Sequence, residues 1–393
     1  MRFLWIFLVL GVAACSKGSS GGGSTTGNQP SVKVSDVTQA RQTQASAFRF
    51  YIDLSTASQQ AVTVSYTTAD GTAKAGADYT AASGTVTIPA GQTEVYVDVS
   101  VAGDSLRQAD QTFYMQLSNP VNSTLGTSKA TATIINSDLL YLPTDTTGYR
   151  TPKSYPGYTL VWSDEFNGNS LNTGDWNYEQ GGNGWGNHEL ENYTNRTQNA
   201  FVSAGNLIIE ARQESYSGSN YTSARLTTQG KRSFTFGRID IRAKLPVAKG
   251  MWPALWMLGT DISSVPWPGC GETDIMELVG SNPNRVTGSL HWQQAGGSEG
   301  TYNNNYFLPS GQDFSQQFHV FSIVWQNNSV QFLVDDQVYV NGSSANVTSG
   351  TYPFNSPFFF IFNVAVGGDW PGSPDGTTNF PQRMYVDYVR VFQ

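Results

Sequence analysis

Short runs in which apolar and polar residues alternate recur along most of the chain, and this period of two is typical of β-strands. In the part from Ser31 to Asp138, turn signals such as Asp70-Gly71 and Ala90-Gly91 separate the runs. The clearest runs are Val62–Tyr66, Thr85–Ile88, Val95–Val99 and Ala130–Ile134. About 100 residues with this spacing of strands predict an Ig-like β-sandwich over residues 31–138.

Strand-like segments continue beyond residue 155 to the end of the chain. They include Asn206–Ala211, Gly237–Leu245, Phe321–Trp325, Val330–Val334 and Tyr385–Phe392. Asn327-Asn328 and Asp335-Asp336 predict tight hairpins, and no helix of ordinary length is evident. Residues 156–393 are therefore predicted to form a second all-β domain, a jelly-roll sandwich of two curved antiparallel sheets.

The segments outside the two sandwiches predict export and flexible connections. A short basic start followed by the apolar run Phe3–Val12 is typical of a signal peptide, here over residues 1–14. Small residues before Cys15 resemble a bacterial lipobox, which implies acylation of its thiol; a plain signal peptide is the alternative. Residues 15–30 predict a Gly/Ser-rich tether and residues 139–155 a linker. We expect a protein anchored by lipid to a bacterial membrane, at the outer membrane or the cell surface.

Composition narrows the class of ligand. The formal net charge of −8 argues against binding nucleic acid or an anionic polysaccharide by simple attraction. With 19 Tyr, 21 Phe and 10 Trp, the chain is better suited to a neutral sugar polymer, which is recognised by stacking and hydrogen bonds. Cys15 and Cys270 are the two cysteines of the sequence, so no disulfide framework is expected and Cys270 is predicted to be a buried packing thiol. We expect a monomer.

The segment from Gly271 to Gly280, GETDIMELVG, contains three closely spaced acids. Glu272 and Asp274 share one face of a strand, whereas Glu277 should point the other way. A β-bulge at Ile275 or Met276 would bring all three carboxyls to one side. Such clusters are often solvated charged faces, but these acids lie among apolar residues in a chain that is only 13% charged. Retaining glycoside cleavage requires two carboxyls about 5 Å apart, one as nucleophile and one as acid.

This motif resembles the active-site strand of glycoside hydrolase family 16 in the bulged form (E-x-D-x-x-E) of laminarinases and related endo-β-1,3-glucanases. Further matching segments are WSDEFNG from Trp162, NHELENYT from Asn187, SARLTTQG from Ser223, GMWPALWMLG from Gly250, WPGCG from Trp267, GSLHW from Gly288 and NVAVGG from Asn363. The resemblance runs from about Tyr155 to Gln393. It implies a concanavalin-like sandwich with a substrate cleft across its concave sheet.

The resemblance also implies roles for individual residues. Glu272 would be the nucleophile and Glu277 the acid/base. Asp274 lies between them, and a carboxyl there can hydrogen-bond Glu272 and help hold the two pKa values apart. No metal is needed for the bond cleavage. His291 would lie near the acid/base, although a single histidine on a strand is equally typical of a packed residue.

Substrate and ion contacts are implied for a further set of residues. Trp252 and Trp256 would stack on sugar rings, with core packing as the alternative, whereas Trp162, Trp176 and Trp325 are expected in the core. Contacts to the sugar are also expected from Asn187, Arg225, Trp292 and Gln293. A structural Ca²⁺ would bind at Glu165, Gly205 and Asp387, unless these acids are plain surface residues.

Residues 31–138 resemble a Calx-β domain, through DGTAKAGADYT from Asp70, SGTVTIPAG from Ser83 and LSNP from Leu117. Members that bind Ca²⁺ carry three glutamates where Gln39, Gln108 and Gln111 stand here. Because Ca²⁺ affinity falls as ligand charge is removed, we expect a calcium-poor spacer.

The favoured function is endo-hydrolysis of β-1,3-glucan, with mixed β-1,3/1,4-glucan as a further substrate. One alternative within the fold is a galactanase or transglycosylase. The alternative from another class is a non-catalytic, sugar-binding surface lipoprotein, which the clustered acids disfavour because a pure binder gains nothing from their mutual repulsion.

Overall fold

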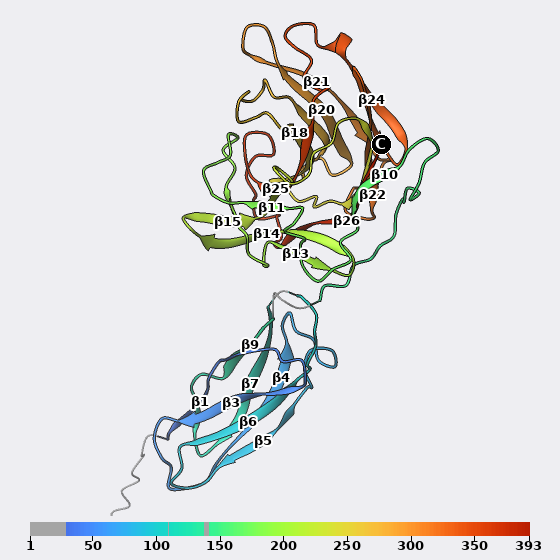
Figure 1. Cartoon of the computed structure of the whole chain (residues 1–393). Coiled ribbons are helices and arrows are strands. Elements are labelled where there is room, and N and C mark those ends of the chain that lie inside the picture. The colour runs from blue at the N-terminus through green and yellow to red at the C-terminus, as the bar shows by residue number, and fades with distance from the viewer. Residues whose placement is uncertain (1–28, 109, 137–140) are drawn as a thin grey trace, which may run out of the picture. The chain divides into compact units, whose positions relative to one another are not determined.

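The computed structural model describes residues 29–108, 110–136 and 141–393, which form two compact units (Figure 1). The predicted signal peptide over 1–14, the lipidation of Cys15 and the tether up to residue 28 lie outside the described residues. Each unit is a sandwich of two β-sheets, in agreement with the all-β prediction.

The N-terminal unit packs a four-stranded sheet on a five-stranded one. The first sheet has the order β6 (Glu94–Val101), β3 (Ser46–Leu54), β1 (Ser31–Val34) and β8 (Thr124–Leu125). The second has the order β2 (Val37–Ala40), β9 (Lys129–Ile135), β7 (Gln111–Val121), β4 (Val62–Asp70) and β5 (Ser83–Ile88). Phe48 and Phe50 on β3 and Phe113 on β7 are fully buried between the sheets. The alternation of apolar residues thus gives the predicted sandwich.

The environment of Asp104 bears on the calcium hypothesis for this segment. Its Oδ2 accepts hydrogen bonds from Arg41 Nη1 at 2.6 Å and Gln108 Nε2 at 2.8 Å. The Arg41 side chain is only 2% exposed. A buried guanidinium supplies positive charge where a cation would otherwise be needed, which supports the calcium-poor interpretation.

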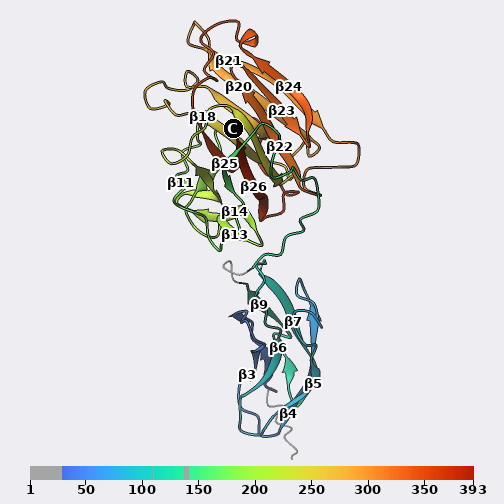
Figure 2. The ribbon, with the colours of Figure 1, turned by 45° about the vertical axis from the view of Figure 1, so that its right-hand side comes forward.

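The C-terminal unit is built on the same principle with larger sheets. Its ten-stranded sheet contains β10 (Leu160–Asp164), β12 (Glu191–Tyr193), β13 (Ala200–Ser203), β14 (Asn206–Tyr216), β15 (Ser219–Ser223), β17 (Gly237–Lys244), β22 (His319–Gln326), β23 (Ser329–Val334), β24 (Gln337–Ser343) and β26 (Gln382–Phe392). Its seven-stranded sheet has the order β11 (Asn177–Glu179), β16 (Arg225–Thr227), β25 (Phe358–Val366), β18 (Met251–Gly259), β19 (Glu272–Glu277), β20 (Arg285–Gln293) and β21 (Glu299–Phe307). Figure 2 shows β18, β20 and β21 in one layer and β22, β23 and β24 in the other.

The two predicted hairpins are present. Asn327-Asn328 joins β22 to β23, and Asp335-Asp336 joins β23 to β24. Both aspartates have positive φ, 49° and 63°, as a two-residue turn between twisted strands requires. These turns fix the register of β22, β23 and β24 in the ten-stranded sheet.

A single apolar core lies between the two sheets. Trp162, Trp176 and Trp325 belong to it, as predicted, and Cys270 is buried in a small neighbouring cluster. Burial raises the pKa of the Cys270 thiol to about 11, so the thiol stays protonated at neutral pH. In the described parts of the chain, Ser344–Asn346 forms a 3-10 turn, and no helix is long and apolar enough to cross a membrane.

Part of the segment predicted as a linker packs on the C-terminal sandwich instead. Arg242 is fully buried and donates hydrogen bonds to the carbonyls of Thr146 and Tyr149. The Thr151 N–H donates to the hydroxyl of Tyr388 at 3.0 Å. A single bridge between Gly148 and Phe318 is the one β-pairing described for residues 146–151, and side chains of the sandwich satisfy other backbone groups of this segment.

Candidate active site

Strand β19 carries the three acids and contains the bulge that their spacing requires. Along β18, Trp256 pairs with Asp274 and the preceding Leu255 pairs with Met276, so Ile275 is the extra residue. Against β20, Asp274 pairs with Ser289 and Glu277 with Thr287, which shows the same one-residue shift. The bulge returns Glu277 to the face of Glu272 and Asp274, and all three side chains line one cleft.

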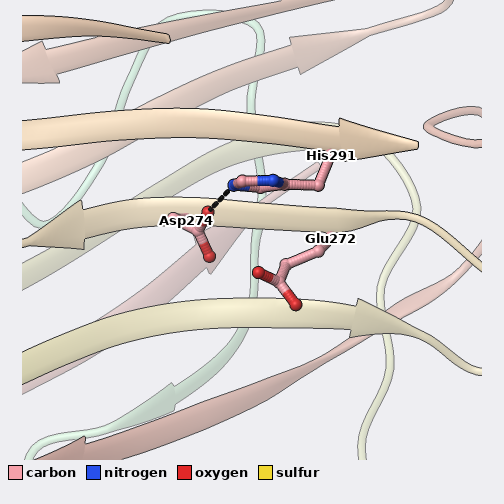
Figure 3. A group of neighbouring side chains, drawn as sticks. All are labelled: Glu272, Asp274 and His291. Atoms are coloured by element: carbon pink, nitrogen blue, oxygen red, sulfur yellow. Dashed lines mark ion pairs between the residues drawn. The ribbon is translucent and has the colours of Figure 1, made fainter. Parts of the chain in front are cut away.

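His291 lies across from these acids on β20, where it pairs in register with Glu272. Its Nε2 is 2.9 Å from Oδ2 of Asp274 in an ion pair, and the three side chains point toward one another in Figure 3. Asp274 therefore pairs with His291, and its hydrogen bond to Glu272 stays a prediction. The Glu272, Asp274 and His291 side chains each place one polar atom within 4.8 Å of the others.

The cleft has a volume of about 550 Å³ and lies over the seven-stranded sheet. Aromatic rings form much of its wall. The tryptophans that line it are Trp185, Trp252, Trp256, Trp267 and Trp370. Trp252 and Trp256 lie on one face of β18, as their spacing predicted, and Trp370 meets Trp252 edge to face at 5.5 Å.

A polar network holds Trp256 in place. Its indole Nε1 donates to Oδ1 of Asn363 at 2.8 Å, and Asn363 Nδ2 donates to the hydroxyl of Tyr193 at 3.0 Å. The Tyr193 hydroxyl in turn donates to Glu189 Oε2 at 3.0 Å. The guanidinium of Arg225 lies 4.7 Å from the ring of Trp256. These contacts fix one wall of the cleft before any ligand binds.

Burial and mutual repulsion shape the protonation of the two glutamates. Burial raises the pKa of Glu277 to about 8, the charge of Asp274 adds to this, and His291 and a hydrogen bond from Trp252 Nε1 at 3.0 Å oppose it. Burial also raises the pKa of Glu272, as do Asp274 and Glu277, whereas His291 and Arg225 lower it. Arg225 favours the ionised form of Glu272 in particular.

The positive charge of His291 comes from its neighbours. Burial by itself would lower the pKa of this imidazole, but the carboxylates of Asp274, Glu272 and Glu299 outweigh burial and raise it to about 10. His291 is therefore an imidazolium at neutral pH, placed directly beside the acids.

Two of the residues predicted to bind sugar are not in the cleft. Trp292 is 4% exposed, belongs to the core and donates its Nε1 to the carbonyl of Ser349. Strand alternation explains this correction, because His291 faces the cleft and its neighbour must face inward. Gln293 is exposed at the end of β20 and donates to the carbonyl of Gly297, outside the residues that line the cleft. Asn187 and Arg225 do line it.

The two carboxylates among the predicted calcium ligands pair with arginines. Both oxygens of Glu165 accept hydrogen bonds from Arg390, at 2.7 and 2.8 Å. Asp387 accepts one from Arg242 at 2.6 Å. Arginine thus neutralises both carboxylates, which disfavours Ca²⁺ at these two side chains, and the predicted site with Gly205 stays a prediction.

The structure adds cleft residues that sequence reasoning did not assign. They are Trp185, Glu189, Trp267, Thr287, Ser289, Glu299, Asn303, Asn363 and Trp370. Thr287 and Ser289 could have been inferred from alternation with His291 on one strand. Trp185 and Trp370 lie in Gly-rich loops, where a large aromatic side chain is itself a signal of a binding surface.

Fold and site together define the class of protein. Residues 187–390, more than half of the chain, match glycosyl hydrolases family 16, and the chain belongs to this family. Residues 28–138 match the Calx-beta domain.

Individual proteins that the chain resembles are named as glucanases. The chain is 44% identical over 249 residues to a beta-glucanase from Rhodothermus marinus, covering 61% of this chain and 86% of the relative. It is 38% identical to glucan endo-1,3-beta-glucosidase A1 from Niallia circulans, covering 63% of this chain and 39% of that protein. The laminarinase catalytic domain of Thermotoga maritima MSB8 superposes with a TM-score of 0.56 at 48% identity, covering 60% of this chain and 98% of that one.

Proposed function

We propose that this protein is an endo-acting glycoside hydrolase that cleaves β-1,3-glucan with retention of configuration. Glu272 attacks the anomeric carbon and forms a covalent glycosyl-enzyme, while Glu277 protonates the departing oxygen. Glu277 then deprotonates the incoming water, which attacks the same carbon and releases the sugar. The laminarinase relatives support β-1,3-glucan as the substrate. Mixed β-1,3/1,4-glucan is the second substrate of this proposal.

The bulge at Ile275 carries this proposal. It places two glutamates on one face of one strand, in a cleft walled by tryptophans, with Asp274 between them. Two carboxyls on the same strand suit the short separation of a retaining enzyme better than the wider gap in which an inverting enzyme holds its water.

Product analysis tests the function directly. The full chain should release oligosaccharides from laminarin, more slowly from lichenan, and none from agarose or xyloglucan. Proton NMR at the start of hydrolysis should show the β-anomer of the product first. Release from agarose alone would indicate a galactanase, and initial appearance of the α-anomer would contradict retention.

The protonation of Glu277 predicts an alkaline limb in the pH profile. Because the catalytic acid must carry its proton, kcat/KM on laminarin should fall above a midpoint near pH 8. Well above that midpoint, the decrease should approach about tenfold for each pH unit. Trp252→Phe removes the indole N–H that stabilises ionised Glu277, so its limb should move to higher pH. A limb that stays in place, or moves to lower pH, would contradict the assignment of Glu277.

We also propose that the N-terminal segment anchors the enzyme to a bacterial membrane. The apolar run before Cys15 and the Gly/Ser-rich stretch after it support lipidation and a tether. The Calx-beta domain would then hold a monomeric catalytic domain away from the surface, toward its polysaccharide substrate.

A further inference from the structure

His291 lies between two carboxylates that come from different strands. On one side its Nε2 is 2.9 Å from Asp274 Oδ2. On the other side its Nδ1 is 2.5 Å from Glu299 Oε1, on β21. Thr301 braces the second contact, because its hydroxyl donates to the same Glu299 oxygen at 2.9 Å. Both contacts are attractive only when both ring nitrogens carry protons, which is the imidazolium form.

The need for this charge follows from the balance of charges in the cleft. Glu272, Asp274 and Glu277 face one another, and the cations that act on Glu272 are His291 and Arg225. Arg225 is itself paired with Glu179, its Nε lying 2.5 Å from a carboxylate oxygen, so part of its charge is already balanced. His291 acts on both Glu272 and Glu277, and it comes before Arg225 among the groups that lower the pKa of Glu272.

The side chains of Asp274, His291 and Glu299 differ in their exposure to solvent. The side chain of Asp274 is 4% exposed, that of His291 is 17% exposed and that of Glu299 is 40% exposed. Asp274 and His291 are too buried for water to screen them, whereas Glu299 reaches the rim of the cleft. A change at Glu299 can therefore alter the charge on His291 without opening the catalytic centre.

We propose that Glu299 is a positioning residue: it holds His291 in its charged form beside Asp274, and this charge favours the ionised form of the nucleophile Glu272. Glu299 does not touch the reacting atoms and acts only through His291. The inference rests on the proposed roles of Glu272 and Glu277. A glutamate at the rim with no more than a surface ion pair would be the ordinary alternative.

Titration of His291 is the direct test. The sequence has three histidines, so the ¹⁵N-labelled full chain gives a small set of imidazole signals, and His291→Gln assigns the relevant one. In the wild type this ring should keep both protons up to about pH 10. In Glu299→Gln it should lose one at clearly lower pH. An unchanged His291 titration in Glu299→Gln would overturn the proposal.

The pH profile provides the second readout. Glu299→Gln should leave kcat/KM on laminarin close to the wild-type value at pH 5, where His291 carries both protons in either protein. As the pH rises through the lowered pKa of His291, the variant should fall about three- to tenfold below the wild type, because Glu272 loses the neighbouring positive charge. Glu94→Gln makes the same chemical change on an exposed residue of β6 and should leave the profile unchanged. A loss in Glu299→Gln that is equal at all pH values, together with a lowered Tm, would indicate a merely structural role and would also overturn the proposal.

Failure of the proposed function looks different from failure of this inference. If the wild type released nothing from laminarin, the function would be wrong whatever the His291 titration showed. If the wild type were active and the pH profiles of wild type and Glu299→Gln superimposed, the function would stand and the role of Glu299 would fall.

Discussion

Glu272→Gln and Glu277→Gln should each reduce kcat on laminarin by at least about 10³-fold while the protein remains folded. An amide at position 272 cannot form the glycosyl-enzyme, and an amide at position 277 has no acidic proton to transfer to the leaving oxygen. Stability should not fall, because each replacement removes a buried carboxyl whose pKa is raised at the expense of folding. Steady-state kinetics and thermal melts of the two variants measure both effects.

Chemical rescue separates the roles of the two glutamates. In Glu272→Ala, azide can enter the space of the missing carboxylate and attack the anomeric carbon, so added azide should partly restore turnover and yield an α-glycosyl azide. Near-wild-type turnover in both glutamine variants would show that β19 does not carry the chemistry.

The sequence predicted the architecture well because the signals for it are local. Alternation gave the strands, and Asp335-Asp336 gave a hairpin because each residue tolerates positive φ. The bulge was also predictable, since three acids on one face demand one extra residue and the candidates were Ile275 and Met276. The register selects Ile275, which could not be chosen from the motif because the choice depends on the pairing of both neighbouring strands.

Contacts between side chains of different segments were the part that the sequence could not supply. Glu299 meets His291 across the hairpin of β20 and β21, only eight positions along the chain, and that contact depends on the register that the connecting loop sets. The carboxylates of Glu165 and Asp387 matched a calcium pattern. In the structure, Arg390 on β26 pairs with Glu165 and Arg242 on β17 pairs with Asp387. Resemblance identifies which residue types are present, whereas the partners that neutralise them depend on packing.

Trp256 and Trp292 were predicted to share a role, and the structure separates them into two environments that predict opposite results. Trp256→Ala should lower kcat/KM on laminarin by about tenfold to hundredfold, or about 1.4 to 2.7 kcal/mol, because the sugar loses the ring on which it stacks. Its Tm should change little, since the ring lines an open cleft. Trp256→Phe keeps an aromatic face and should recover part of the loss.

Trp292→Ala should do the reverse. Its ring fills the core between the sheets, so its removal should cost about 3 to 5 kcal/mol of stability through the cavity it leaves. The folded fraction should retain its KM for laminarin, because the indole points away from the cleft. Trp292→Phe, which leaves a smaller cavity, gives the same comparison in a better-folded protein. A raised KM with an unchanged Tm in the Trp292 variants would show that this tryptophan contacts the substrate and that β20 is paired in a different register.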